Sequence, residues 1–228
     1  RNTLLLSLYD LAAGFPFPIL LALIMHNVPS KRFRRVTQTA TYMPHFISVV
    51  VLVGMMSCMF SVNSGWFSTI VRALGGTPVQ LMGEAKYFRH VYVWSGVWQQ
   101  MGWNSIIYIA AITGIDPTMY EAAELDGAGR FKKMWHVTIP GIKSTIVVLL
   151  IMNLGWVLNT SFEVPYLLGT GMLQDVSQTI DIFVLKYGMS IGNYSLATAA
   201  GIFKSVISLI LVFGTNAFAN RLGESSLM

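Results

Sequence analysis

The sequence predicts an all-α, polytopic helical membrane protein. Of its 228 residues, 54% are hydrophobic and only 11% are charged, whereas about 25% of the residues in a soluble domain are charged. The apolar residues also gather in runs close to the ~20 residues that cross a bilayer core. We therefore expect about five transmembrane helices in a single domain of residues 1–228, at about 3–26, 42–60, 90–113, 142–163 and 196–218.

The basic residues predict the orientation of these spans, because cytoplasmic loops are enriched in Lys and Arg. If segments 27–41 and 114–141 are cytoplasmic, nine basic residues lie inside: Lys31, Arg32, Arg34, Arg35, Arg130, Lys132, Lys133, Lys143 and Arg221. Five then lie outside: Arg1, Arg72, Lys86, Arg89 and Lys186. This orientation puts the N-terminus outside, so we expect an N-terminally truncated chain with at least one further span before Arg1.

The first span contains the sequence Phe15-Pro16-Phe17-Pro18. Prolines inside a helix remove backbone hydrogen bonds and clash with the preceding turn, so we expect this span to be kinked or split. In a bilayer such a break needs neighbours or a cavity that satisfy the freed carbonyls. A simple packing kink and a role in a substrate path both remain open.

The predicted outer loop at 61–89 contains a short amphipathic helix from Gly65 to Leu74, which Gly75 and Gly76 end. Its place in the chain suits contact with an extracytoplasmic binding protein. Its aromatic residues fit equally well a helix that lies at the membrane surface and caps the bundle.

The third span combines indole and amide side chains, namely Trp94, Trp98, Gln99, Gln100, Trp103 and Asn104. Tryptophans near the end of a span mark the membrane interface, whereas deeper ones can stack on a sugar ring whose hydroxyls the amides bind. Hydrogen bonds between helices explain the amides equally well. Gln99 and Trp103 are therefore candidates for a substrate path, with a structural role as the alternative.

The fourth span carries a polar stripe at helical spacing, made by Asn153, Trp156, Asn159 or Thr160, and Glu163. Residues three or four positions apart share one face of a helix. A face with these side chains does not suit contact with lipid. The stripe predicts either a wall of the substrate path or a face hydrogen-bonded to other spans.

Asp10 in the first span and Lys204 in the fifth lie at a similar depth below the outer end of their spans. An ionisable group inside a span is costly, and it is usually paired or faces water. We expect an ion pair between Asp10 and Lys204, with contact between Lys204 and an acidic sugar as the alternative.

The segment 114–141 is the longest polar stretch of the chain. Asp116 and Pro117 predict the start of a short helix, and Gly127 predicts its end. A second helix should follow, with Arg130, Lys132 and Lys133 outside and Phe131, Met134, Trp135 and Val137 available for packing. Two helices joined by a glycine turn exceed what a connector needs, so we expect a docking surface.

This segment carries a family resemblance. Glu121-Ala122-Ala123, three residues, Gly127, nine residues and Val137-Thr138-Ile139-Pro140 resemble the EAA motif of permease subunits of binding-protein-dependent ABC importers, the MetI-like permeases. The family pattern ends in I-x-L-P, and Val137 and Ile139 depart from it conservatively. The stretches RNTLLLS, PFPILLAL, QTATYMPHFIS and ATAAGIFKSV extend the resemblance to oligosaccharide permeases, including those for uronate-type sugars.

The resemblance implies that this chain forms half of the path for an oligosaccharide in the inner membrane of a bacterium. The coupling loop 114–141 would then dock a separate ATPase, through Tyr120, Glu121, Ala122, Ala123, Asp126 and Gly127. ATP and Mg²⁺ would be bound by the ATPase dimer and no cofactor by this chain. The other implied partners are a second, similar permease subunit, an extracytoplasmic solute-binding protein and the lipid bilayer.

Other classes of function fit the residues less well. A secondary transporter would use Asp10, Glu163 and Lys204, but it would leave the docking loop without a task. A scaffold subunit is a weaker alternative. The chain lacks a phosphate-binding loop, and its four histidines, His26, His45, His90 and His136, lack the spacing of metal ligands, so we expect neither an enzyme nor a metal site.

Overall fold

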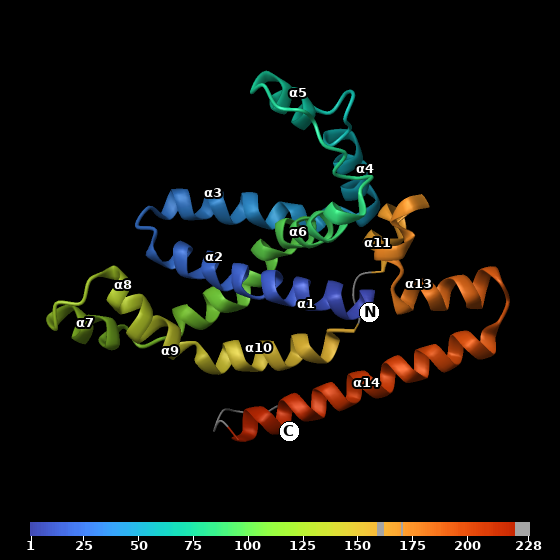
Figure 1. The fold of residues 1–228 in the computed structure, drawn as a ribbon. Helices are drawn as coiled ribbons and strands as arrows, with labels where there is room; N and C mark the ends of the chain where they lie inside the picture. The colour runs from blue at the N-terminus through green and yellow to red at the C-terminus, as the bar shows by residue number, and fades with distance from the viewer. Residues whose placement is uncertain (159–161, 170, 222–228) are drawn as a thin grey trace. The chain divides into compact units, whose positions relative to one another are not determined.

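The computed structural model of this chain describes residues 1–158, 162–169 and 171–221, and every regular element in these ranges is a helix (Figure 1). The α-helices are α1 Asn2–Gly14, α2 Pro16–Asn27, α3 Lys31–Tyr42, α4 Val49–Met59, α5 Trp66–Ala73, α6 Ala85–Thr113, α7 Pro117–Leu125, α8 Arg130–Lys133, α9 Ile139–Gly141, α10 Lys143–Trp156, α11 Glu163–Leu168, α12 Gln174–Ser177, α13 Ile180–Leu185 and α14 Tyr194–Arg221. Two short 3₁₀ helices, η1 Met43–Phe46 and η3 Gly171–Leu173, and two π-helical turns, η2 Met134–Thr138 and η4 Lys186–Ser190, complete the description. The predicted all-α class is confirmed.

Two helices of the described chain are long and apolar enough to cross a membrane, Asn2–Asn27 and Tyr194–Ala217. They agree with the first and fifth predicted spans. Two bent helix pairs raise the number to four if each pair is one span. The third predicted span forms the 29-residue helix α6, which is not among these candidates, so the count of five stays a prediction.

The first span is interrupted at the prolines, as predicted. Helix α1 ends at Gly14 and α2 begins at Pro16, so each proline lies in the first turn of α2, where a missing N–H group costs little. Phe15, which lies between the two helices, keeps a helical backbone, with φ −77° and ψ −46°. The two helices therefore continue as one 26-residue span despite the break.

The fourth predicted span differs from expectation in two ways. The residues before it bend by 59° where the helical stretch Arg130–Gly141 meets α10. Helix α10 then ends at Trp156, and α11 begins at Glu163. Pro165 gives a physical reason, because a proline is tolerated in the first turn of a new helix but not inside a continuous one. The predicted stripe therefore does not lie on one continuous helix.

The second predicted span is interrupted, because its residues form the short helix η1 and the 11-residue helix α4, and the segment before it is helical. Residues 31–42 form helix α3, and α3 with η1 meets α4 at an angle of 102°. In the predicted outer loop, α5 occupies Trp66–Ala73, and Gly75 follows it with a φ of +81°. The predicted outer-loop helix and its glycine end are therefore confirmed.

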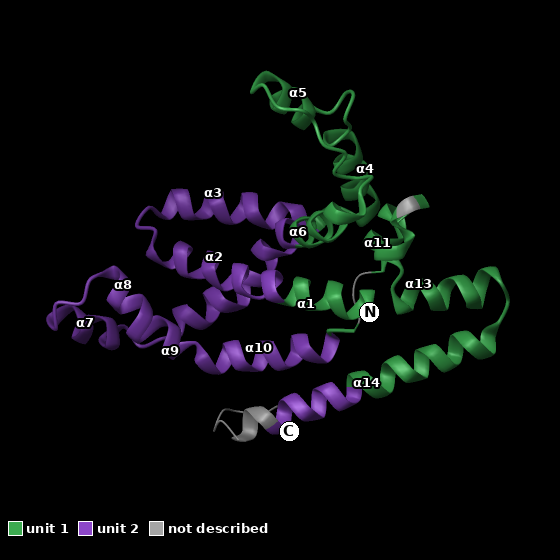
Figure 2. Ribbon diagram, viewed as in Figure 1, with its two compact units in different colours: residues 1–11, 46–96, 157–208 green, residues 12–45, 97–156, 209–228 purple. Residues whose placement is uncertain are grey.

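The chain divides into two compact units, each made of segments distant in sequence (Figure 2). Unit 1 contains residues 1–11, 46–96 and 157–208, and unit 2 contains residues 12–45, 97–156 and 209–228. In unit 2 a core of buried side chains joins α2, the second half of α6 and the residue between α9 and α10: Ala22, Leu23, Tyr108, Ile112 and Ile142. This core connects the segment 114–141 to the helices on both sides of it.

Candidate functional site

The docking loop, residues 114–141, begins with a capped helix. The Asp116 carboxylate accepts a hydrogen bond of 2.9 Å from the backbone N–H of Thr118, and Pro117 occupies the first helical position. This hydrogen bond holds the pKa of Asp116 below its ordinary value, because it favours the charged form. The predicted start of α7 is thereby confirmed.

Gly127 ends α7 with a left-handed backbone, at a φ of +74°. The N–H of Gly127 donates to the carbonyl of Glu124 at 3.0 Å, and the N–H of Ala128 donates to the carbonyl of Ala123 at 2.9 Å. These two bonds form a Schellman motif, which glycine favours because it lacks a Cβ atom. The chain therefore turns at Gly127, as predicted.

Two side-chain contacts join the two halves of the docking loop. The Tyr120 hydroxyl lies 3.1 Å from the Thr138 hydroxyl, and Lys133 Nζ donates to Glu124 Oε2 at 2.6 Å. Thr138 is almost completely buried in the π-helical turn η2. The hydrogen bond from Lys133 lowers the pKa of Glu124, and the positive charge of Lys133 lowers it further. The first helix is thus held against the second.

The structure exposes most of the side chains predicted to dock an ATPase. Glu121, Ala122, Asp126 and Gly127 are exposed, whereas Tyr120 and Ala123 are half-buried. The exposed residues form the outer surface of α7 and the turn that follows it. Tyr120 instead faces inward. Its hydroxyl is hydrogen-bonded to Thr138, and its ring centroid lies 5.5 Å from that of His26.

Exposed apolar side chains flank the same turn. Leu125 is 90% exposed and Phe131 is 82% exposed. Phe131 and Trp135 are predicted to be available for packing, but both are exposed, because this stretch packs through Met134, Val137 and Thr138 instead. Val137 is buried and Met134 is half-buried. Leu125 was missed in the sequence, where only its position two residues before the glycine could have indicated a surface role.

The loop and the span pattern together match a known family. Residues 14–224 match the family described as "Binding-protein-dependent transport system inner membrane component". The chain belongs to this family of membrane permeases. The resemblance inferred from the EAA motif is thereby confirmed, and the secondary transporter is not supported.

Relatives and solved structures of this permease family agree over nearly the whole chain. Protein LplB of Bacillus subtilis is 40% identical over 227 residues, which are 100% of this chain and 71% of LplB. The polygalacturonan/rhamnogalacturonan transport system permease protein YteP of the same organism is 41% identical with the same coverage. In the crystal structure of a bacterial alginate ABC transporter in complex with an alginate pentasaccharide-bound periplasmic protein, one chain superposes with a TM-score of 0.96 at 37% identity, covering 99% of this chain and 78% of that one.

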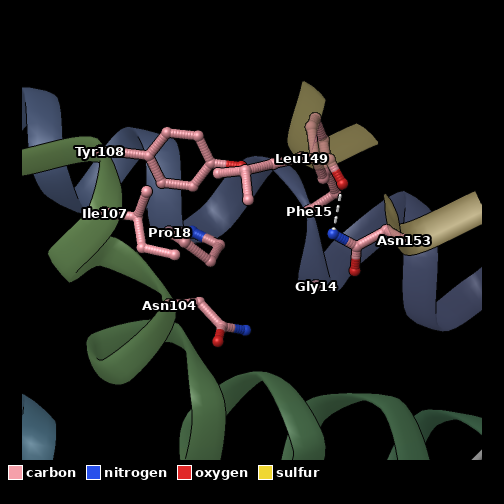
Figure 3. Close-up of a pocket in the computed structure, with 8 residues that line it drawn as sticks. All are labelled: Gly14, Phe15, Pro18, Asn104, Ile107, Tyr108, Leu149 and Asn153. Carbon is pink, nitrogen blue, oxygen red and sulfur yellow. Dashed lines mark hydrogen bonds between the residues drawn. The ribbon is translucent and has the colours of Figure 1, made fainter. Parts of the chain in front are cut away.

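A second candidate region lies inside unit 2, beside the proline break. A cavity of about 100 Å³ is lined by Gly14, Phe15, Pro18, Asn104, Ile107, Tyr108, Leu149 and Asn153. Figure 3 shows the side-chain amides of Asn104 and Asn153 at this cavity, on α6 and α10. Asn153 donates to the carbonyl of Leu149 at 2.7 Å. Asn153, one of the predicted path residues, thus lies at a cavity that carries two side-chain amides, next to the break in the first span.

The other predicted path residues are distributed differently. Gln99 is buried in α6. Trp103 stacks on His45, with ring centroids 4.3 Å apart, and His45 also lies 2.8 Å from the amide oxygen of Gln100. For Trp103 and Gln100, these contacts fit the alternative in which the third-span residues have a structural role.

The remaining path candidates lie at the break in the fourth span. Trp156, the last residue of α10, is exposed, and Glu163, the first residue of α11, is exposed as well. Asn159 lies outside the described residues. The path assignment of Asn153, Trp156, Asn159, Glu163, Gln99 and Trp103 stays a prediction.

The predicted partner of Lys204 needs correction. Lys204 Nζ lies 2.5 Å from Asp181 Oδ1, in a contact where only 13% of the lysine side chain and 26% of the aspartate side chain are exposed. Asp10 instead lies beside α6, with its carboxylate next to Gly96. Asp181 was overlooked because it lies outside every predicted span, on the short helix α13.

Proposed function

We propose that this chain is the permease subunit of an ATP-driven importer for acidic oligosaccharides in the cytoplasmic membrane of a bacterium. Family membership carries the proposal of import. The substrate class rests on the similarity to YteP, whose name includes polygalacturonan, and to an importer of the acidic polysaccharide alginate. An extracytoplasmic binding protein would deliver the sugar, and a second permease subunit would complete the path.

The docking loop is proposed to bind a separate ATPase subunit. The exposed surface of α7 would enter a groove on the ATPase, where Glu121 meets a basic side chain and Ala122 and Ala123 permit close approach. Leu125 and Phe131 extend this surface with apolar area that water otherwise covers. ATP and Mg²⁺ would be bound by the ATPase dimer, which supplies the energy of nucleotide binding and hydrolysis.

Contacts inside unit 2 give the loop a route to the spans. Tyr120 of α7 bonds Thr138, and Ile139 and Ile142 pack with Leu23 of α2 and Ile112 of α6. A movement of α7 would thus pass through packed side chains rather than through a flexible linker. Closely packed interiors shift as units rather than deform smoothly, which suits switching between inward-open and outward-open states.

The charge-reversing variant Glu121→Lys tests the docking role. In the reconstituted complex with its binding protein, we expect the affinity for the ATPase to fall about a hundredfold, because reversing one charge of a buried pair costs a few kcal/mol. Sugar-stimulated ATP hydrolysis should fall with it. The matched control is Glu84→Lys, which alters a half-buried glutamate that pairs with Lys86 outside the docking loop and should leave both quantities unchanged.

The same experiment separates import from its rivals. ATP hydrolysis that oligogalacturonate stimulates in the wild type and not in Glu121→Lys supports the proposal. Uptake that follows an ion gradient and ignores ATP would overturn it. An ATPase that binds Glu121→Lys as tightly as the wild type would overturn the docking role alone.

A further inference from the structure

The outer segment, residues 163–193, belongs to unit 1 (Figure 2). A cavity of about 610 Å³ lies within this segment. Most of its lining comes from α11, α12, α13 and η4. Small-molecule sites typically occupy roughly 300–1,000 Å³, so the cavity has the size of a ligand site. One span separates it from the docking loop, and the proposed function therefore places it on the extracytoplasmic side.

The charge of this cavity is positive. Lys186 is the single charged side chain in the described lining, and no Asp or Glu is part of it. The ammonium group of Lys186 has no ion-pair partner in the part of the chain that the structure describes. A lysine is a donor only, so the group that complements it best is an anion such as a carboxylate.

The remaining lining suits a sugar. The Tyr166 side chain is 52% exposed at the cavity, and an aromatic face can cover the apolar face of a sugar ring. Gln174 and Gln178 add amides, which can donate to and accept from hydroxyl groups. The apolar part of the wall includes Ile182 and Leu185. Few polar groups on an apolar wall are typical of ligand sites.

Long-range hydrogen bonds hold one wall of the cavity in place. Asn2 donates from its side-chain amide to the carbonyls of Asp175 and Gln178, at 2.7 and 3.2 Å. Thr3, which is buried, accepts from the N–H of Ile180 at 3.0 Å. A wall that is already ordered reduces the entropy that a ligand must overcome on binding.

The position of Lys186 adds a separate indication. It is the first residue of η4, one of the two π-helical turns of the described chain, and single π-helical turns occur frequently at functional sites. Lys204, the other basic residue proposed to contact an acidic sugar, already forms an ion pair with Asp181. Lys186 is therefore the better candidate for a sugar carboxylate in unit 1.

We propose that the outer-segment cavity is a binding subsite for one uronate residue of the imported oligosaccharide. Lys186 holds its carboxylate, Gln174 and Gln178 bind its hydroxyls, and Tyr166 covers its ring. This inference rests on the proposed import of acidic oligosaccharides and adds a place on the permease itself where the charge of the sugar is recognised.

The test measures binding of trigalacturonate to the purified permease–ATPase complex in nanodiscs without its binding protein, by calorimetry. Lys186→Met should raise the Kd about tenfold to a hundredfold, the effect of losing one hydrogen bond to a charged group. Lys186→Arg should restore most of the affinity. The matched control Lys86→Met removes another exposed lysine of the predicted outer side and should leave the Kd unchanged.

A second ligand separates charge recognition from other roles. The same trisaccharide with its carboxyl groups reduced to alcohols should bind the wild type and Lys186→Met equally. Equal Kd values of trigalacturonate for both proteins would overturn the inference, and so would a parallel loss for both sugars. If Lys186→Met does not assemble, Tyr166→Ala serves instead, and unchanged affinity for trigalacturonate would then overturn the site.

A different result would contradict the proposed import of acidic oligosaccharides rather than the subsite. Wild-type complex that hydrolyses ATP without any response to oligosaccharide and binding protein contradicts the import of acidic sugars. Wild-type complex that imports trigalacturonate while Lys186→Met binds it normally contradicts the subsite alone.

Discussion

The docking loop and the outer segment both connect candidate spans, but they are held together in different ways. In the docking loop the two side-chain contacts join residues nine and eighteen positions apart. In the outer segment the hydrogen bonds that Asn2 donates and Thr3 accepts bridge 173 to 177 positions. The first region is thus organised by its own sequence, whereas the second takes its shape only when the chain has folded.

The two regions also differ in burial. The ion pair of the docking loop, Glu124 with Lys133, has a glutamate side chain that is 76% exposed. The ion pair that joins the outer segment to α14, Asp181 with Lys204, is mostly buried. Solvent screens exposed charges, whereas a charge left buried without its partner is costly. We therefore expect the loss of one partner to cost far more stability in the second pair than in the first. The predictions below test this difference, from the largest effect to the smallest.

Removing one partner of the outer pair should have the largest effect. Lys204→Met leaves the Asp181 carboxylate partly buried and unpaired, which should lower the free energy of unfolding by about 3 kcal/mol. The double variant Lys204→Met/Asp181→Leu should recover most of this loss, since no unpaired charge remains. Denaturant titration in detergent micelles measures both.

Lys186→Met is the control for this first prediction, because Lys186 is exposed and has no ion pair in the described chain. It should leave the unfolding free energy unchanged. A double variant that is as unstable as Lys204→Met would show that the unpaired Asp181 carboxylate is not the source of the loss.

The second prediction concerns the glycine turn of the docking loop. Gly127→Ala places a Cβ atom on a backbone with a φ of +74°, a conformation that costs roughly 1–2 kcal/mol for a residue with a side chain. The affinity of the complex for its ATPase should fall about fivefold to thirtyfold, the factor that corresponds to this energy. Pull-down with purified ATPase measures the change.

Gly129→Ala is the matched control for Gly127→Ala. Both glycines have open space where a Cβ atom would lie, but Gly129 has a φ of −69°. Space is therefore equal and only the backbone conformation differs. Equal loss of affinity in both variants would show that the turn conformation is not what the ATPase needs.

The third prediction concerns the contact between the halves of the docking loop. Tyr120→Phe removes the hydroxyl that bonds Thr138, and one such hydrogen bond contributes about 1 kcal/mol. A double-mutant cycle with Thr138→Val, built from free energies of unfolding, should return a coupling energy of that size. A coupling energy indistinguishable from zero would mean that the two halves are held by apolar packing alone.

The same difference between the regions explains what the sequence could predict. The cap at Asp116 and the turn at Gly127 follow from neighbouring residues, and both are where the sequence placed them. The partner of Lys204 could not be found in this way, because Asp181 and Lys204 meet only through the fold. The helix break before Glu163 had a local signal in Pro165, which the periodic spacing of polar residues obscured. The exposed position of Leu125 had only its closeness to Gly127 as a local signal.

The smallest effect should come from the exposed pair of the docking loop, and it should appear mainly as a dependence on pH. Lys133 lowers the pKa of Glu124 below its ordinary value of 4.5. The folded state therefore binds this proton less readily than the unfolded state. The stabilisation is complete above the ordinary pKa of glutamate and is lost as the pH falls through the lowered value. Mild acidification from neutral pH should therefore leave the stability almost unchanged.

Carbon-13 shifts of the Glu124 carboxylate, followed through an acid titration in nanodiscs, measure this pKa directly. Lys133→Met should raise the pKa of Glu124 towards its ordinary value, and high salt should do the same in part because the pair is exposed. Asp116 is the internal control, since the hydrogen bond from Thr118 and not Lys133 lowers its pKa. If Glu124 titrates identically in both proteins, the pair does not hold α7 to the second helix. The organisation of the docking loop by its own sequence would then rest on the Gly127 turn and on the contact between Tyr120 and Thr138.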